Sequence, residues 1–279
     1  MRGFLMNEKE LTLEEKWEQA TIANNFLFYK VMHDNPDVCK QLLEILLEME
    51  IDKIDMNTQE VINIDWRSKG IRLDVYAKNS NQVFDIEMQS TDTLELPERA
   101  RYYQGAMDID SLKAGDEYKD LKNSYVIFIC IPDIFNKGLP VYTFENLCRQ
   151  DTSVPLGDRA LKYFFISTNC DKLLNEEQKA FMRLVRGNES SNAFTDRVAH
   201  LTEDAKRNNE YKRQYMEWER QKAYEFRRGK EEGKEEAKLE AAITLVNKYN
   251  ASPETAANDM EIPLEKLLES LETRTKSQA

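Results

Sequence analysis

Residues 70–89, which read GIRLDVYA, KNSNQ and VFDIEMQ in succession, decide the fold of this chain. In residues 71–77 and 83–89 apolar side chains alternate with polar or charged ones, and this period of two is typical of β-strands. The polar residues 78–82 between them predict a tight turn. The stretch therefore predicts a hairpin, in which the register decides which side chains become neighbours.

The hydrophobic pattern selects the register of this hairpin. If the numbers of paired residues sum to an odd value, such as 159 or 161, the apolar side chains of both strands share one face. An even sum would bury carboxylates among apolar side chains, so we expect the odd register. It places Asp74 beside Asp85 or Glu87, with the Cβ atoms of direct neighbours about 4.5–5.5 Å apart.

Carboxylates at this spacing repel one another unless a cation shares them. Mg²⁺ prefers oxygen ligands in an octahedral arrangement and retains several waters. Asp74, Glu87 and the backbone carbonyl of Met88 would be a sufficient protein contribution to such a site. The same alternation is also typical of the solvated face of an amphipathic hairpin, so the pattern alone leaves both interpretations open.

The elements around the hairpin predict one mixed α/β domain. Their order is a helical region, three strands, a helix, further strands and a closing helix. We expect a helical region at 14–49 with a break at 35–36, strands at 61–66, 71–77 and 83–89, a helix at 97–112, strands at 125–131, 141–144 and 161–167, and a helix at 176–185.

An Asp on one strand, followed after a short turn by Glu-x-Gln on the next, resembles the PD-(D/E)xK nuclease superfamily. The chain is more closely similar to its recombination-promoting nuclease and transposase family. The stretches that carry the resemblance are 26–32, 69–75, 84–89, 96–104 and 126–130, within residues 24–170. The resemblance implies a restriction-endonuclease-like mixed β-sheet core flanked by helices, with a long helical C-terminal tail outside it.

The resemblance also implies an activity, which is metal-dependent hydrolysis of phosphodiester bonds in DNA. Asp74 and Glu87 become the acids that bind Mg²⁺, or Mn²⁺ as a substitute, and Gln89 occupies the position of the usual lysine. The amide of Gln89 can orient the attacking water, but it stabilises negative charge less than a lysine does. Glutamine is nevertheless usual here in this branch. Glu44 is the candidate for the helical acid that the superfamily often adds.

The expected helix that follows the acids carries candidate DNA contacts. We expect Arg99 and Arg101 to contact backbone phosphates of DNA. Gln104 is expected to bind DNA or to support the acidic site from behind. The two tyrosines Tyr102 and Tyr103 are expected to pack this helix on the sheet.

The composition limits the available chemistry. The 279 residues include 51 acidic residues against 39 Lys and Arg, a formal net charge of −12 that argues against indiscriminate nucleic-acid binding. Only two histidines are present, so carboxylates are the expected carriers of catalysis. No apolar run reaches 18 residues, early acids disfavour a signal peptide, and the four cysteines match no zinc spacing. We expect a cytoplasmic protein without a membrane partner.

The composition changes near residue 190, which predicts three regions. They are a nuclease-like domain at 1–190, a charged long helix at 191–250 and a small helical module at 251–279. Between Lys206 and Lys230 there are nine Lys or Arg against four Glu, a stretch that would bind phosphates or form a solvated helix. Tyrosine and tryptophan at helical spacing there predict a seam for a partner helix, hence a homo-oligomer. Residues 252–271 weakly resemble a helix-turn-helix.

Two other functions stay open at this stage. A DNA-binding or oligomeric assembly protein that keeps the nuclease fold without catalysis would account for Gln89 and for the negative net charge. An interaction module whose tail drives oligomerisation would account for the long charged helix.

Overall fold

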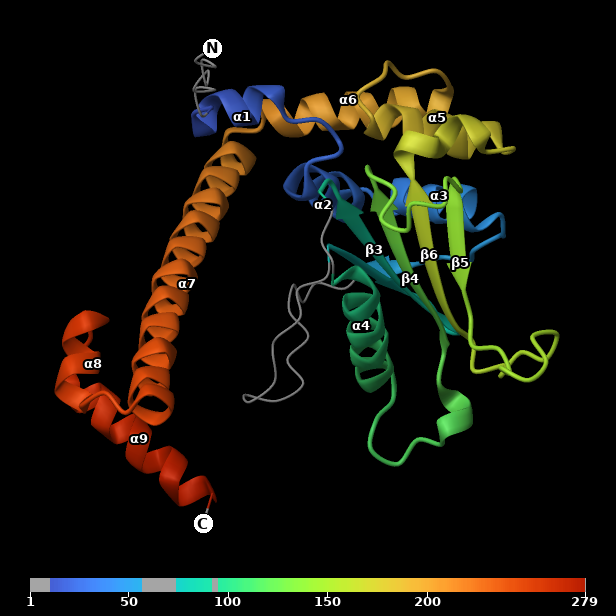
Figure 1. Cartoon of the computed structure of the whole chain (residues 1–279). Helices are drawn as coiled ribbons and strands as arrows, with labels where there is room; N and C mark the ends of the chain where they lie inside the picture. The colour runs from blue at the N-terminus through green and yellow to red at the C-terminus, as the bar shows by residue number, and fades with distance from the viewer. Residues whose placement is uncertain (1–10, 57–73, 92–94, 279) are drawn as a thin grey trace. The chain divides into compact units, whose positions relative to one another are not determined.

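The computed structural model describes residues 11–56, 74–91 and 95–278 (Figure 1). The chain divides into two compact units, of which the first ends at Lys212 and the second begins at Arg213. The first unit contains the β-sheet and the candidate site.

Three helices replace the helical region expected at 14–49. They are α1 (Leu13–Gln19), α2 (Asn25–Asp34) and α3 (Pro36–Leu47). The Asn24 side chain begins α2 by accepting hydrogen bonds from the first free backbone N–H groups. Proline at the first position of α3 confirms the predicted break between α2 and α3.

The described residues form a six-stranded mixed sheet in the order β1-β2-β3-β4-β6-β5. The strands are β1 (Asp55–Met56), β2 (Val75–Lys78), β3 (Gln82–Gln89), β4 (Asn123–Cys130), β5 (Val141–Phe144) and β6 (Ala160–Ile166). The pairs β3–β4 and β4–β6 are parallel, and the other three are antiparallel. This sheet confirms the expected restriction-endonuclease-like α/β fold. The strand expected at 61–66 lies outside the described residues.

The β2–β3 hairpin has the predicted register. Val75 pairs with Ile86 and Ala77 with Phe84, so the numbers of paired residues sum to 161. The turn is closed by Asn79, whose side-chain oxygen accepts from the backbone N–H groups of Asn81 at 2.9 Å and Gln82 at 2.8 Å.

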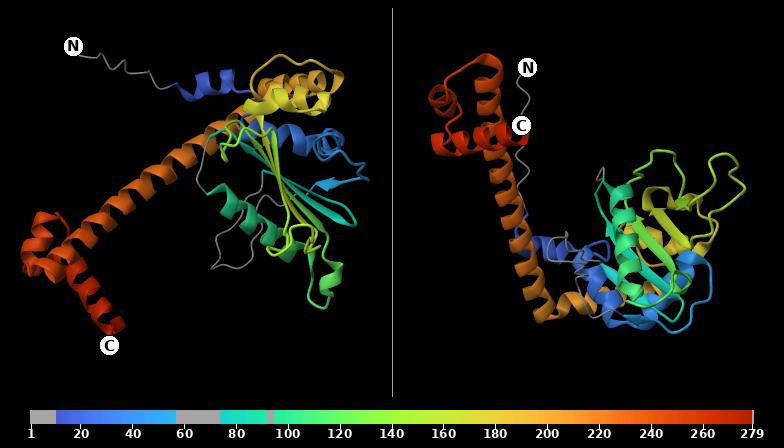
Figure 2. Two further views of the ribbon diagram at one scale, coloured as in Figure 1. Left: turned by 45° about the vertical axis from the view of Figure 1, so that its right-hand side comes forward. Right: turned by 90° about the horizontal axis from the view of Figure 1, so that it is seen from below.

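Helices cover both faces of the sheet. Helix α4 (Leu96–Ser111) packs on the face that carries Val83 and Val126, whereas α2 and α3 lie on the opposite face (Figures 1 and 2). Both faces of β3 are therefore buried, and the side chains of Asp85 and Glu87 are 0% and 3% exposed. The interpretation of these acids as a solvated face is wrong, because α4 covers them.

The first unit extends beyond the expected boundary at residue 190. After α5 (Glu176–Val185), helix α6 (Ala193–Arg207) packs against α2, with Phe194 and Val198 buried. Trp17 of α1 donates its indole N–H to the backbone oxygen of Lys206 at 3.2 Å. Helix α6, expected as part of the tail, therefore belongs to the unit that contains the sheet.

The second unit is a small helical assembly. It contains most of α7 (Asn209–Tyr249), together with α8 (Pro253–Asp259) and α9 (Leu264–Gln278). The Ser252 side chain caps α8 by accepting from the backbone N–H of Thr255. The core of this unit consists of Ala242, Ile243, Ala256, Ala257 and Leu267. In the part of the chain that the structure describes, no helix combines the length and apolarity that a membrane span needs.

Candidate active site

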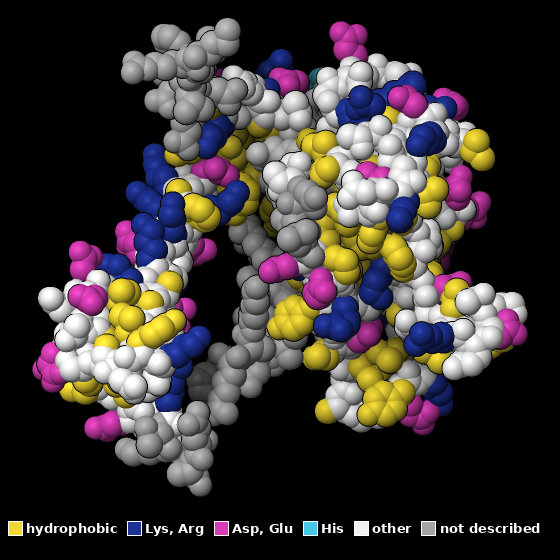
Figure 3. Space-filling model, viewed as in Figure 1, with side chains coloured by type: hydrophobic (Ala, Val, Ile, Leu, Met, Phe, Trp, Pro, Cys, Tyr) yellow, Lys and Arg dark blue, Asp and Glu magenta, His cyan; other side chains and the backbone are white. Residues whose placement is uncertain are grey.

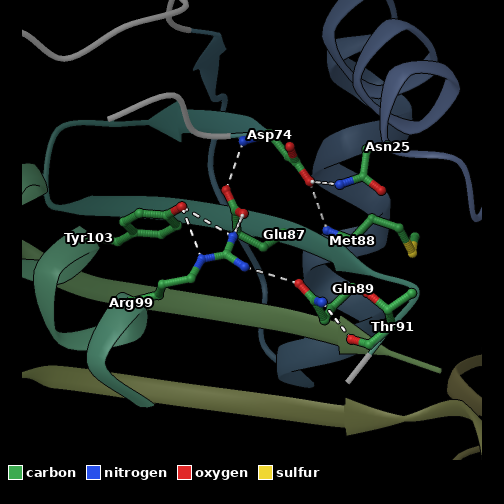
Figure 4. Close-up of polar contacts among 8 residues, drawn as sticks. All are labelled: Asn25, Asp74, Glu87, Met88, Gln89, Thr91, Arg99 and Tyr103. Carbon is green, nitrogen blue, oxygen red and sulfur yellow. Dashed lines mark hydrogen bonds and ion pairs between the residues drawn. The ribbon is translucent and has the colours of Figure 1, made fainter. Parts of the chain in front are cut away.

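Asp74 and Glu87 are held together by backbone N–H groups of each other's strands. The backbone N–H of Asp74, just before β2, donates to Oε1 of Glu87 at 2.8 Å (Figure 4). The backbone N–H of Met88 donates to Oδ2 of Asp74 at 3.0 Å. The register that the hydrophobic pattern selects therefore also brings the two acids opposite each other.

The backbone carbonyl of Met88 points toward the side of β3 on which Asp74 lies. Successive residues in a strand direct their carbonyl groups to opposite neighbours. The carbonyl oxygen of Gln89 accepts from the backbone N–H of Ile131, on the β4 side. The Met88 carbonyl is thus directed toward β2, where Asp74 lies.

Helix α2 contributes a residue that the sequence did not reveal. The Asn25 side-chain amide donates to Oδ2 of Asp74 at 3.2 Å. Asn25 is the first residue of α2, directly after the capping residue Asn24. The capping pattern could have located this helix end, but nothing in the spacing shows that it meets Asp74.

Arg99 of α4 binds the other acid. Its Nη2 lies 3.0 Å from Oε2 of Glu87, and its Nη1 donates to Oε1 of Gln89 at 3.1 Å (Figure 4). The Gln89 amide also donates to the backbone oxygen of Thr91 at 2.5 Å. Both ends of the Gln89 side chain are therefore fixed.

The electrostatics of the site are dominated by crowded carboxylates. Burial, and then the negative charge of Asp74, raise the pKa of Asp85 well above its usual value. Burial, followed by the charges of Asp74 and Asp85, raises the pKa of Glu87 well above its usual value. Arg99 offsets only part of this effect. A further cation would stabilise the ionised forms of these acids.

Asp85 offers a direct test of whether the site suits a divalent metal. Both of its carboxylate oxygens are buried and have no hydrogen-bond partner among the described residues. A buried carboxylate in this condition is stable when protonated or when a nearby cation neutralises it. No three His, Cys, Asp or Glu side chains within the described ranges form a metal site by themselves. Two acids, a carbonyl and waters remain a set that Mg²⁺ tolerates, so the residues present fit the ion.

Glu44, the expected helical acid, has other partners. Its Oε1 accepts from the Lys40 ammonium at 2.6 Å and from the backbone N–H of Ile51 at 3.0 Å. These bonds tie the end of α3 to the following segment. Asn25 of α2 bonds to Asp74.

The other two predicted DNA contacts have different surroundings. Gln104 is 5% exposed and donates to the backbone oxygen of Ser124, so it fastens α4 to β4 and does not present a surface for DNA. Arg101 is exposed and lines a hollow of about 430 Å³ together with Lys162 and Phe144. Basic and hydrophobic side chains lie side by side on the face of the molecule around α4 (Figure 3).

The mixed sheet with its flanking helices is consistent with the restriction-endonuclease-like class of α/β proteins. The family model described as PD-(D/E)XK nuclease family transposase matches residues 23–225, which is more than half of the chain. The chain belongs to this family, which confirms the resemblance seen in the sequence. Nucleases of this superfamily generally use divalent metal ions and act on DNA. The comparisons find no match among curated proteins or solved structures.

Proposed function

We propose that this protein is a metal-dependent DNA endonuclease of a transposase-related, recombination-promoting family. The observation that carries the proposal is the opposition of Asp74 and Glu87, each held by a backbone N–H of the other's strand. This backbone anchoring holds two carboxylate ligands close together, next to the buried carboxylate of Asp85. Family membership supports the same activity.

Each residue of this site would have a separate role in phosphodiester hydrolysis. Asp74, Glu87 and the Met88 carbonyl would hold Mg²⁺ or Mn²⁺, and Asn25 would keep the Asp74 carboxylate in place. When bound, the ion polarises the phosphodiester and stabilises the leaving oxygen. Gln89 would orient the attacking water with the remaining hydrogen-bonding capacity of its fixed amide.

The arginine on the exposed side of α4 is proposed to contact the DNA. Arg101 and Lys162 both line the hollow described above, and both can bind backbone phosphates. Of the three DNA contacts expected from the sequence, Arg101 is on the exposed side of α4 and Gln104 is buried. Arg99 lies at the acids, where it is bonded to Glu87 and Gln89.

The nuclease proposal is tested by nicking of supercoiled plasmid DNA in Mg²⁺ or Mn²⁺. We expect Asp74→Asn and Glu87→Gln to lower the rate at least about 100-fold, equivalent to roughly 3 kcal/mol of transition-state stabilisation. Asp52→Asn, which changes an exposed acid after α3, is the matched control and should cut normally. Equal cutting by all four proteins would place the activity elsewhere or in a contaminant.

A second candidate function is DNA binding without catalysis. The observation that favours it is that Glu87 and Gln89 are already engaged by Arg99. Tight binding of DNA duplexes, with no cleavage across a range of Mg²⁺ and Mn²⁺ concentrations, would support this candidate over the nuclease.

We also infer that α7 mediates self-association. Tyr224 and Phe226 of this helix are 53% and 73% exposed, so both side chains are available to a second copy of the chain. Light scattering of the full chain and of a Tyr224→Ser, Phe226→Ser variant tests this inference, because an unchanged mass would remove these residues from that role. The four free cysteines are consistent with a reducing, cytoplasmic location.

A further inference from the structure

A positive charge lies beside the position at which this chain has glutamine in place of lysine. The Arg99 guanidinium donates to Gln89 Oε1 at 3.1 Å and to Glu87 Oε2 at 3.0 Å. It comes from α4, ten residues after Gln89 in the sequence. Arg99 of α4 thus places a positive charge beside residue 89, where β3 itself has none.

Arg99 is held firmly in this position. Its Nε and Nη2 donate to the Tyr103 hydroxyl at 3.3 and 3.1 Å. Its Cζ lies 5.4 Å from the centre of the Tyr103 ring and 5.6 Å from that of Phe128. These contacts order the side chain before any substrate arrives, which lowers the cost of orienting it during reaction.

The guanidinium retains the capacity to bind an anion. Of its five N–H groups, four donate to Glu87, Gln89 and Tyr103. The second N–H of Nη1 has no partner within the ranges that the structure describes. The Arg99 side chain is 32% exposed, whereas that of Glu87 is 3% exposed. The free N–H is therefore on the more accessible of the two side chains.

We propose that Arg99 is the catalytic cation of this site and that it performs the task of the lysine that Gln89 replaces. Its free Nη1–H donates to a non-bridging oxygen of the scissile phosphate and stabilises the negative charge that develops there. Its other donors keep Glu87 and Gln89 in place. This inference rests on the proposed nuclease function and deepens it, because it names the residue that binds the reacting phosphate.

A purely structural role for Arg99 makes different predictions. In that case the ion pair would only fix the Glu87 side chain, and its removal would loosen a metal-binding acid. Moving the positive charge to residue 89 separates the two roles. The variants are Arg99→Gln, Gln89→Lys and the double variant that carries both changes, with Arg183→Gln as the control, since Arg183 pairs with exposed Asp171.

Cleavage kinetics provide the first measurement. We expect Arg99→Gln to lower kcat for plasmid nicking about 100-fold with little change in KM, as the loss of one preorganised donor does. The double variant should recover at least about tenfold of that loss, because its lysine restores a charge beside Glu87. The control should retain the wild-type kcat. No recovery in a folded double variant would overturn the proposal.

Binding of Mn²⁺ alone, measured by calorimetry, provides a readout without catalysis. Removing the Arg99 charge next to the acids should tighten Mn²⁺ binding about tenfold, because two cations no longer compete for the same carboxylate. The double variant should return to an affinity near that of the wild type. Weaker binding by Arg99→Gln would instead indicate the structural role and contradict the proposal.

The two measurements separate failure of the inference from failure of the proposed function. If the wild type neither binds Mn²⁺ nor nicks DNA, the nuclease proposal fails and this inference fails with it. If the wild type does both and Arg99→Gln retains its kcat, only the inference fails. Should Arg99→Gln not fold, Arg99→Lys keeps the charge and is expected to retain at least about a tenth of kcat. A loss as complete as that of Asp74→Asn would overturn the proposal.

Discussion

At the scale of single residues, Asp85 has the most unfavourable environment in the site. Its side chain is fully buried, and neither oxygen accepts a hydrogen bond from any residue that the structure describes. Its neighbours Asp74 and Glu87 are also acidic. Because an isolated buried charge costs several kcal/mol, Asp85 destabilises the metal-free protein in its ionised form.

We predict that Asp85→Asn stabilises the metal-free protein at neutral pH. The substitution removes the charge with almost no change in shape, and a gain of about 1 kcal/mol would raise the melting temperature by about 3 °C. Thermal unfolding at pH 7.5 in EDTA measures the effect, with exposed Asp52→Asn as the control. A lower melting temperature would show that the Asp85 charge has a stabilising contact.

The sequence predicted the opposition of Asp74 and Glu87 within one hairpin, but it did not predict that Asn25 bonds to Asp74 or that Arg99 bonds to Glu87. Asp74, Glu87 and Gln89 follow from the alternation and the turn length, because strand geometry fixes neighbours within a hairpin. Asn25 lies 49 positions before Asp74 in the sequence. Arg99 lies on α4, the helix after β3, and bonds to Glu87. Contacts between separate elements depend on how those elements pack, and the local pattern does not contain that information.

At the scale of elements, one loop is organised around a single acid. Asp133 follows β4 and accepts from the backbone N–H groups of Phe135, Asn136 and Gly138 and from the Tyr142 hydroxyl. Desolvation acts to raise the pKa of Asp133, but these hydrogen bonds outweigh it and lower the pKa below its usual value. The carboxylate therefore stabilises the loop in its ionised form.

We predict that Asp133→Ala destabilises the protein by about 2 kcal/mol at pH 7, because several donors lose one acceptor. The folded-state pKa lies below the unfolded one, so this stabilisation is present above about pH 4 and is lost as the pH falls through the folded-state value. Unfolding by urea at pH 7 and near pH 3 measures the difference between variant and wild type. Exposed Glu145→Ala is the control, and an equal difference at both pH values would contradict the prediction.

Strong periodicity made most elements predictable, and the exceptions have physical causes. Strand β1 has two residues, too few to show a period. The long helix expected over 191–250 is two helices, because Asn208 interrupts it. The Asn208 side chain caps α7 by accepting from the N–H groups of Glu210 and Tyr211. The helical pattern continues across this residue, so only the capping asparagine marks the break.

At the scale of the whole molecule, composition and packing divide the chain at different places. The change in composition falls near residue 190, but α6 is bound to the first unit by buried Phe194 and Val198 and by the ion pair of Arg197 with Asp37. Helix α6 is amphipathic, with a charged, solvated outer face. Its average composition therefore looks polar, although one of its faces is apolar and buried.

We predict that a protein ending at residue 212 unfolds cooperatively and that one ending at residue 190 is less stable. Removing α6 exposes the surface of α2 that it covers. The loss of two or more buried side chains lowers the free energy of unfolding by about 4 kcal/mol. Urea unfolding of the two proteins, followed by circular dichroism, measures the difference. Equal stability would mean that α6 contributes nothing to the first unit.

The backbone anchoring of Asp74 and Glu87 makes the site sensitive to the length of one turn. Each acid is fastened by a peptide N–H of the opposite strand, so its alignment depends on the hairpin register more than on any neighbouring side chain. One extra residue beside Asn79 would shift the pairing and turn alternate side chains to the wrong face. Two extra residues could extend the loop and leave the acids opposed. Related chains that retain this site should therefore tolerate length changes in this turn mainly in steps of two.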